Sequence, residues 1–186
     1  MLHRCLLALL LSFGLSAAAS ALDLPTLQRL LQAEIVPSFN FQEQRESPWL
    51  TAPVLSTGSM HRSAEALEKR VLVPRVETWR LLADRMEWIG PRAQDRKQIL
   101  YRDVPAVAVL AHALRRVIDG DLLALAPDFQ LALAGDLKVW TLRLTPRQAD
   151  MARHLDHLEL QGSGGQLQVI IVVERQAERT TTRLLR

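Results

Sequence analysis

Hydrophobic residues recur along this chain at two different spacings. Between Leu24 and Ile35 they return every three or four residues, as on one face of a helix, and Pro37 ends the segment. Asp23 followed by Pro25 is typical of a helix start. The same spacing returns over residues 104–118, so two amphipathic helices are predicted. Two shorter helical pieces are predicted at residues 121–125 and 146–151.

The other hydrophobic residues alternate with polar ones, which is the two-residue period of a half-buried strand. In the first such stretch Phe39 and Phe41 share one face, and Asn40 and Gln42 share the other. Pro, Gly and Asp residues separate the stretches at short intervals, as in an antiparallel meander. The predicted strands are 38–45, 54–62, 66–73, 76–83, 85–89, 98–101, 129–133, 140–144, 155–160, 167–173 and 179–185. The fold class is therefore α+β, with a large, curved antiparallel sheet.

The stretch from Val169 to Val173 is apolar at every position, so both faces of this strand are predicted to be covered. A helix on one side with partial exposure on the other would account for it. So would a curved sheet whose concave face holds more apolar surface than two helices can fill. The second arrangement would create a cavity of lipid size.

The first 21 residues have the three parts of a secretory signal peptide. His3 and Arg4 precede an apolar run over residues 5–15, and Ala19-Ser20-Ala21 offers the small residues that a signal peptidase accepts. The apolar run is shorter than the roughly 20 residues that span a bilayer. We predict cleavage after Ala21, export to the periplasm and a single domain over residues 22–186.

Composition narrows the possible chemistry of the exported chain. Cys5 is the only cysteine and is lost with the signal peptide, which excludes disulfides, thiolate catalysis and cysteine metal sites from the mature chain. Without Arg4, 22 basic side chains face 20 acidic ones, and the two signs are interspersed. A nucleic-acid interface needs a basic stripe with stacking aromatic residues, and the sequence has none.

The candidate chemical motifs have simpler structural interpretations. His154 and His157 have a metal-ligand spacing but fall between a helix and a strand, without a third ligand nearby in sequence. Asp119 and Asp121 flank Gly120 and are interpreted as a helix C-cap followed by the N-cap of the next helix. We therefore predict no catalytic residues, no metal site and no cofactor.

Several short segments, taken in order, resemble the periplasmic lipoprotein carriers of the LolA type, especially their divergent LolA-related branch. They are Phe41-Gln42-Glu43-Gln44-Arg45, Pro53-Val54-Leu55-Ser56-Thr57-Gly58, Leu67-Glu68-Lys69-Arg70 with Pro74, Gly120-Asp121, the strand beginning at Phe129, Trp140-Thr141-Leu142-Arg143-Leu144-Thr145-Pro146, and Leu158-Glu159-Leu160-Gln161-Gly162. Together they span nearly the whole mature chain.

The resemblance implies a strongly curved, incomplete β-barrel with α-helices over its concave side and an apolar cavity for acyl chains. It also implies a monomeric carrier without catalysis that moves lipid or acylated lipoprotein cargo between the inner and outer membranes. An inner-membrane transporter and an outer-membrane acceptor would be its partners. The inward residues that we expect to line the cavity are Phe39, Phe41, Leu67, Val71, Trp79, Leu81, Trp88, Leu110, Leu114, Phe129, Leu131, Trp140 and Leu142.

One position departs from the main branch of these carriers. There an arginine in the loop after the second strand is linked to holding a helix lid closed and to cargo release. Counted from Gly58, this chain has Ala64 at that place, with Arg62 two residues away. The cargo and its outer-membrane acceptor are therefore left open.

Two other functions fit the same pattern. A periplasmic scaffold would use the sheet to dock an inner-membrane protein, with Trp49 and Trp79 as interface anchors and the apolar face as core only. A hydrolase or transferase acting on a lipid-linked substrate would need a polar residue with a perturbed pKa inside the pocket. An open apolar pocket favours the carrier over the scaffold.

Overall fold

The computed structural model describes residues 22–92 and 94–186. Within these residues eleven strands form one sheet, in which each strand pairs antiparallel with its neighbours. The strands are β1 Ser38–Glu46, β2 Val54–Arg62, β3 Leu67–Val73, β4 Glu77–Leu81, β5 Arg85–Ile89, β6 Arg96–Leu100, β7 Phe129–Gly135, β8 Trp140–Pro146, β9 Leu155–Ser163, β10 Gln166–Glu174 and β11 Arg179–Leu185. Their order is β6-β5-β4-β3-β2-β1-β11-β10-β9-β8-β7. The predicted signal peptide lies outside the described residues.

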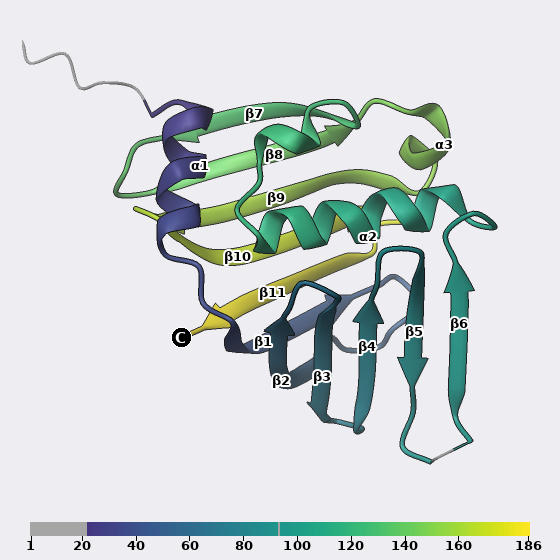
Figure 1. Ribbon diagram of the computed structural model, residues 1–186. Coiled ribbons are helices and arrows are strands. Elements are labelled where there is room, and N and C mark those ends of the chain that lie inside the picture. Colours follow the sequence, from purple (N-terminus) through teal and green to yellow (C-terminus); the bar gives the residue numbers. More distant parts are fainter. Residues whose placement is uncertain (1–21, 93) are drawn as a thin grey trace, which may run out of the picture.

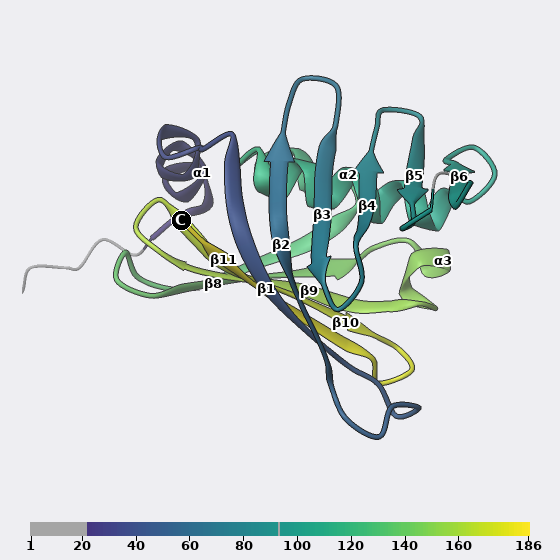
Figure 2. The ribbon, with the colours of Figure 1, turned by 90° about the horizontal axis from the view of Figure 1, so that it is seen from below.

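The sheet is strongly curved and does not close. In Figure 1, β7 to β11 run across the view, whereas β3 to β6 run almost at right angles to them. The outermost strands, β6 and β7, pair on one side only. Seen from below in Figure 2, β1 and β2 form a long twisted ribbon that joins the two parts of the sheet. The predicted incomplete barrel with helices on its concave side is confirmed.

The two predicted amphipathic helices are α1, Leu24–Ala33, and α2, Pro105–Ile118. The side chain of Asp23 caps α1 by accepting a hydrogen bond from the Thr26 amide at 2.8 Å. A 3-10 turn, η1 at Leu123–Leu125, and a short helix, α3 at Ala149–Ala152, match the shorter predicted pieces. Among the described residues, no helix has both the length and the apolar character needed to cross a bilayer.

The turn after α2 agrees with the predicted capping in part. Asp119 is the C-cap of α2, and Gly120 follows in a left-handed conformation with φ of 64°. Asp121 does not cap the next helix, because the N-cap of η1 is Leu122. The Asp121 carboxylate instead pairs with Arg116 at 2.9 Å. Asp121 therefore ties the turn back to α2.

The main hydrophobic core lies between the helices and the strands β7 to β10. Its largest fully buried side chains come from these strands and from the N-terminal and central helices, and they are Trp140, Phe129, Leu27, Leu122, Leu125, Leu142, Leu144, Leu158, Leu160 and Val117. Ile170 of β10 also faces this core, and Ile171 on the opposite face is only 4% exposed. The apolar stretch of β10 is thus covered on both faces, as predicted.

A second, smaller cluster lies where β1, β2 and β3 meet. It contains Phe39, Phe41, Met60 and Val71. Gly58 of β2 faces the ring of Phe41, and a Cβ at this position would lie 1.9 Å from the Arg70 carbonyl oxygen. Only glycine allows β3 to approach this closely.

The main core gives a direct test of the fold. Leu160→Ala removes a side chain with no exposed surface and should lower the free energy of unfolding by about 2–5 kcal/mol. Leu137→Ala, at a side chain 52% exposed, is the matched control and should change it by no more than about 0.5 kcal/mol. Urea unfolding of both variants measures the difference, and equal effects would contradict this placement of the core.

Candidate functional site

A large cavity separates the concave face of β1 to β5 from α2. Its volume is about 690 Å³, within the range of about 300–1,000 Å³ found for small-molecule pockets. The sheet contributes Met60, Leu67, Val71, Trp79, Leu81 and Met86 to its apolar wall, and α2 contributes Leu110, Leu114 and Ile118. Ile170 and Val172 of β10 complete this wall.

The cavity exists because the helices cover only part of the sheet. Helix α1 packs on β10 and η1, and the side chains beneath it form the main core. Helix α2 contacts η1 and α3 and touches the sheet again at β4. The inward side chains of β3 to β5 therefore face a gap beneath α2 instead of a packed layer.

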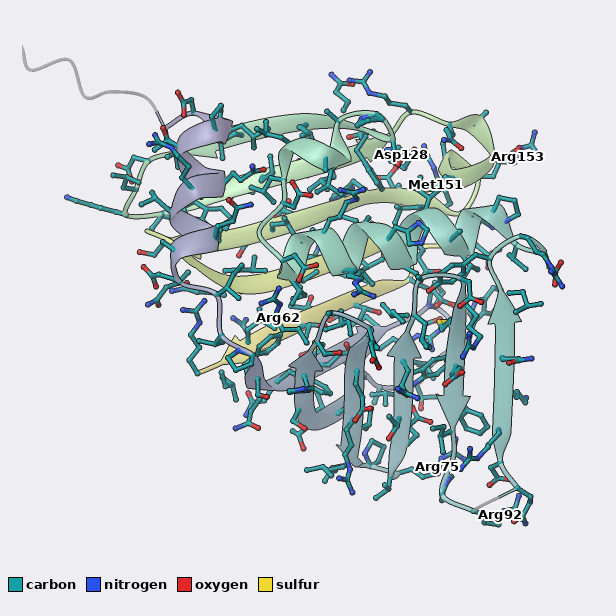
Figure 3. The ribbon with its side chains drawn as sticks, viewed as in Figure 1. Arg62, Arg75, Arg92, Asp128, Met151 and Arg153 are labelled. Carbon is teal, nitrogen blue, oxygen red and sulfur yellow. The ribbon has the colours of Figure 1, made fainter. Side chains whose placement is uncertain are left out.

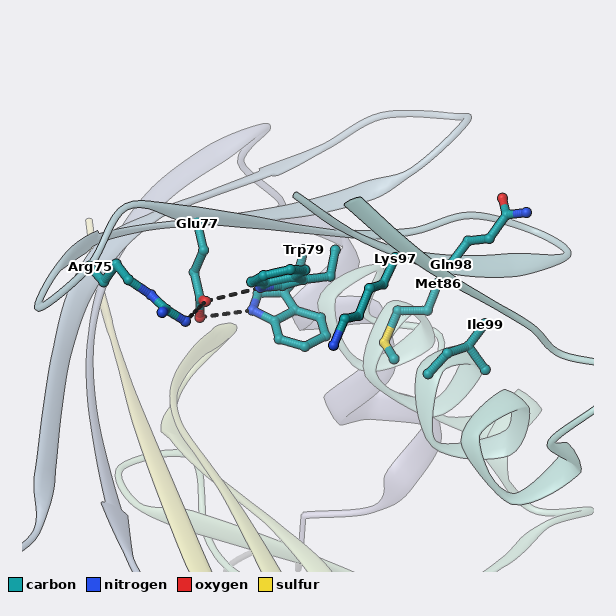
Figure 4. Close-up of a pocket in the computed structure, with 8 residues that line it drawn as sticks. Arg75, Glu77, Trp79, Met86, Lys97, Gln98 and Ile99 are labelled. Carbon is teal, nitrogen blue, oxygen red and sulfur yellow. Dashed lines mark hydrogen bonds and ion pairs between the residues drawn. The ribbon is translucent and has the colours of Figure 1, made fainter. Parts of the chain in front are cut away.

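A second cavity of about 540 Å³ continues from the first toward β6. The two share four lining residues, namely Arg75, Glu77, Trp79 and Met86. Trp88, Lys97, Gln98 and Ile99 complete the second cavity, as the close-up in Figure 4 shows for the side chains of its wall. The inward face of the short strands thus offers one continuous, largely apolar channel.

A carboxylate held by two indole rings lies where the cavities join. Glu77 accepts hydrogen bonds from the Nε1 atoms of Trp79, at 3.1 Å, and Trp88, at 3.0 Å (Figure 4). Arg75 lies 3.6 Å from the same carboxylate. Burial acts to raise the pKa of Glu77, but the indole donors and Arg75 outweigh it and leave this pKa below its usual value. Glu77 is therefore a charged wall residue at neutral pH.

A second polar group lies deeper in the first cavity. Lys69 Nζ lies 2.6 Å from the Glu43 carboxylate, which also accepts a hydrogen bond from the Thr182 hydroxyl at 2.7 Å. The Lys69 ammonium also lies 5.0 Å from the centre of the Phe41 ring. This cation and this carboxylate compensate each other, so the deep wall carries no unpaired charge at this point.

Comparison with known proteins identifies the family. The chain matches the family described as "Outer membrane lipoprotein carrier protein LolA-like" over residues 16–185. It belongs to this LolA-like family. No curated protein matches it in sequence.

Several solved structures align with most of this chain at low identity and with TM-scores below 0.5. A LolA superfamily protein from Nitrosomonas europaea is 11% identical, with a TM-score of 0.45, over 89% of this chain and 93% of that one. A putative outer membrane lipoprotein-sorting protein domain from Vibrio parahaemolyticus is 8% identical, with a TM-score of 0.41, over 88% and 89% of the two chains. MucB, in complex with MucA(peri), is 16% identical, with a TM-score of 0.41, over 86% of this chain and 53% of MucB.

The structure divides the thirteen residues expected to line the LolA-like cavity into two groups. Those that line the first cavity are Leu67, Val71, Trp79, Leu81, Leu110 and Leu114, and Trp88 lines the second. Those that lie instead in the packed clusters are Phe39, Phe41, Phe129, Leu131, Trp140 and Leu142. In the second group, α1, α2 and η1 or the neighbouring strands already cover the inward face. We correct their expected position from cavity wall to core.

Met86, Glu77 and Arg75 belong to the cavity wall but were not among the expected residues. Met86 pairs with Leu81 across β4 and β5, and Glu77 is two residues from Trp79 on the same strand. Both share the inward face by strand alternation, so the pattern itself contained the signal. Arg75 lies in the turn before β4, where alternation gives no information.

The loop between β2 and β3 is attached to α2 by two arginines. Arg115 of α2 donates hydrogen bonds to the backbone carbonyls of Ser63, Ala64 and Glu65. Arg62, labelled in Figure 3 near the end of α2, pairs with Asp119 at 2.8 Å. The loop position occupied by Ala64 is thus a hydrogen-bond acceptor, and the arginine that contacts it comes from the helix.

The described part of the chain contains no group of three or more His, Cys, Asp or Glu residues that could hold a metal ion. His157 bonds to its neighbour Asp156 at 2.7 Å. The walls of the two cavities offer apolar contacts and a few charged groups. Such a site can hold an apolar molecule with a polar end.

The contact between Arg115 and the loop can be tested by its removal. Arg115→Ala leaves the three carbonyls without this donor, and we expect a loss of about 1 kcal/mol in unfolding free energy and about 2–4 °C in Tm. Arg153→Ala, which removes an exposed pair with Asp150 near α3 (Figure 3), is the control and should leave Tm unchanged. Calorimetry distinguishes the two, and an unchanged Tm in Arg115→Ala would show that the contact does not hold α2.

Acid should reduce the stability that the Glu77 carboxylate contributes through its indole hydrogen bonds. Because the pKa of Glu77 is lower in the folded protein than its ordinary value of 4.5, its stabilising contribution is present above that value and is lost as the pH falls through the folded pKa. Glu77→Gln lacks this contribution at every pH. The difference in Tm between wild type and Glu77→Gln should therefore shrink between about pH 6 and about pH 3. A difference that stays constant over this range would contradict the assignment.

Proposed function

We propose that this LolA-like protein is a periplasmic carrier that binds the acyl chains of a lipid or of a lipid-linked cargo in its two joined cavities. It moves them between the inner and outer membranes without covalent chemistry. The observation that supports the proposal most is the open apolar cavity of about 690 Å³ under α2, continued by one of about 540 Å³. A scaffold that needed the sheet only as core would have this space filled.

The energetics of acyl-chain burial suit a shuttle. Each methylene removed from water contributes about 0.8 kcal/mol, so about ten methylenes in the channel contribute about 8 kcal/mol. Association opposes this with a cost of at least about 4 kcal/mol. The remaining binding free energy is of the same order as the free energy with which a single acyl chain binds a bilayer, which is marginal. A cargo chain can therefore exchange between membrane and protein in both directions.

Helix α2 is the element that would move to admit or release cargo. It supplies the apolar roof through Leu110, Leu114 and Ile118, and its polar contacts to the sheet include those of Arg115 and Asp119 with the β2–β3 region. These polar contacts can be exchanged for contacts with water at small cost. Ala113 and Val117 keep the other face of α2 in the main core, so the helix would tilt away from the cavity while this face stays packed. In this proposal an inner-membrane donor and an outer-membrane acceptor act on the loop around Ala64.

A catalytic role is less well supported. Glu77 satisfies part of the requirement for a hydrolase or transferase, because it is polar, lies in the cavity and has a displaced pKa. The displacement is downward, however, which makes the carboxylate a weaker base, and a general base works best with a pKa near the operating pH. Both of its oxygens are also engaged by indole donors.

A scaffold function is the second candidate, and one observation favours it. The loop between β1 and β2 projects beyond the sheet in Figure 2. Trp49 in this loop is 78% exposed, and Leu55 at the start of β2 is 64% exposed. An exposed tryptophan is a frequent anchor of protein interfaces. A carrier also needs such a surface for its donor and acceptor, so this feature is compatible with both functions.

Partial filling of the cavity tests the carrier proposal. Leu81→Trp adds side-chain volume at a wall position and should displace about two methylenes of bound chain, worth about 1.6 kcal/mol. The Kd for a fluorescent fatty acid should therefore rise about fifteenfold. Leu137→Trp, on an exposed turn, is the matched control and should leave the Kd unchanged. Absence of fatty-acid binding by the wild type, with no lipid extracted from the purified protein, would refute the carrier function and favour the scaffold.

A further inference from the structure

Two cations line the second cavity. Arg75 follows β3, and its side chain is 66% exposed. Lys97 is an exposed residue of β6. In Figure 4, Arg75 and Lys97 lie on opposite sides of Trp79, and Figure 3 places Arg75 at the end of the short strands away from α2. The wall of the second cavity thus carries two positive charges that water can reach.

These two cations differ from the other cations of the channel wall in how they are paired. Lys69 and Arg45 each lie 2.6 Å from a carboxylate oxygen, so both are paired at close range. Arg75 approaches Glu77 only to 3.6 Å, and no carboxylate of the described residues lies within ion-pair distance of the Lys97 ammonium. Lys97 instead lies 5.7 Å from the centre of the Trp88 ring.

Glu77 is the only acidic residue among those that line the second cavity within the described chain. Its oxygens accept the indole hydrogens of Trp79 and Trp88, which direct its charge into the wall. Two cations therefore face one carboxylate that already has other partners. An incoming anion would find an attractive field in this cavity, and hydrogen-bond donors on both sides.

From this arrangement we propose that the ligand is an anionic amphiphile, whose phosphate or carboxylate head binds between Arg75 and Lys97 while its acyl chain extends along Trp79 and Met86 toward α2. The inference rests on the proposed lipid-carrier function and adds the charge and the orientation of the ligand. A cationic head is excluded by the same two charges, and the face of Trp88 that could accept one is occupied by Lys97. A neutral head would leave Lys97 without an anionic partner and Arg75 with only its 3.6 Å contact to Glu77.

Competition between amphiphiles of equal chain length tests the head-group preference. Dodecyl phosphate, dodecanoate, dodecanol and inorganic phosphate are each titrated against the neutral fluorescent probe N-phenylnaphthylamine bound to the full chain, below micelle-forming concentrations. We expect both anionic amphiphiles to displace the probe at lower concentration than dodecanol, by about two- to fivefold for each cation involved. Inorganic phosphate should not displace it, because it has no chain.

Removing the charges of Arg75 and Lys97 tests whether these two residues bind the head group. Arg75→Gln and Lys97→Gln should each reduce the preference for dodecyl phosphate over dodecanol by about two- to fivefold, and the double variant should abolish it. Lys97→Arg should retain the preference. Lys138→Gln, which removes an exposed lysine from the β7–β8 turn, is the matched control and should have no effect.

The outcomes separate this inference from the function on which it rests. Equal displacement by dodecyl phosphate and dodecanol in the wild type, or a preference that survives in the double variant, would overturn the head-group site while leaving the carrier function intact. Displacement by inorganic phosphate alone would overturn it as well, because the anion would then bind without the chain. Failure of the wild type to bind the probe and every amphiphile would overturn both.

Discussion

The apolar inner face of the sheet is longer than the helices that lie on it, and much of this structure depends on that mismatch. Helix α1, η1 and the adjoining part of α2 seal the face formed by β7 to β10, where Trp140, Phe129 and Leu160 lose all contact with water. Beyond β1 the strands shorten and turn away from this core (Figure 1). Their inward side chains then have only one edge of α2 to pack against, so the curvature that closes the core on one side opens a cavity on the other.

The main core gives the protein its stability, whereas the cavity and its roof, α2, can change conformation. The core has the dense apolar packing that opposes local opening. The cavity wall instead carries a few polar groups, and two of its carboxylates are paired within the wall, Glu43 with Lys69 and Glu77 with two indoles. Pairing keeps the cost of burying charge low when water leaves the channel. The roof, α2, is attached to the β2–β3 loop chiefly by hydrogen bonds that water can replace.

The sequence predicted the helices and strands better than it predicted which inward side chains a helix covers. Alternation placed the strands correctly because a strand with one buried face must have an apolar residue at every second position. The bounds of β2, β5 and β11 agree with the prediction. It could not separate Trp140 from Trp79, since both are inward tryptophans in alternating strands and differ only in whether a helix covers them. The contact of Arg115 with the Ala64 loop joins residues about fifty positions apart, and no local pattern encodes it. Alternation along β4 already assigned Glu77 to the inward face with Trp79, whereas the place of Arg75, in the turn before β4, became visible only in the structure.

The central claim is that the space under α2 is a binding site for acyl chains. Native mass spectrometry of the protein purified from its own cell envelope, followed by lipid extraction of the same sample, tests this most directly. The account predicts a bound species carrying an acyl chain in the wild type and its reduction when Leu81 is replaced by tryptophan. Recovery of the protein without lipid, in a form that also fails to take up added fatty acid, would contradict it.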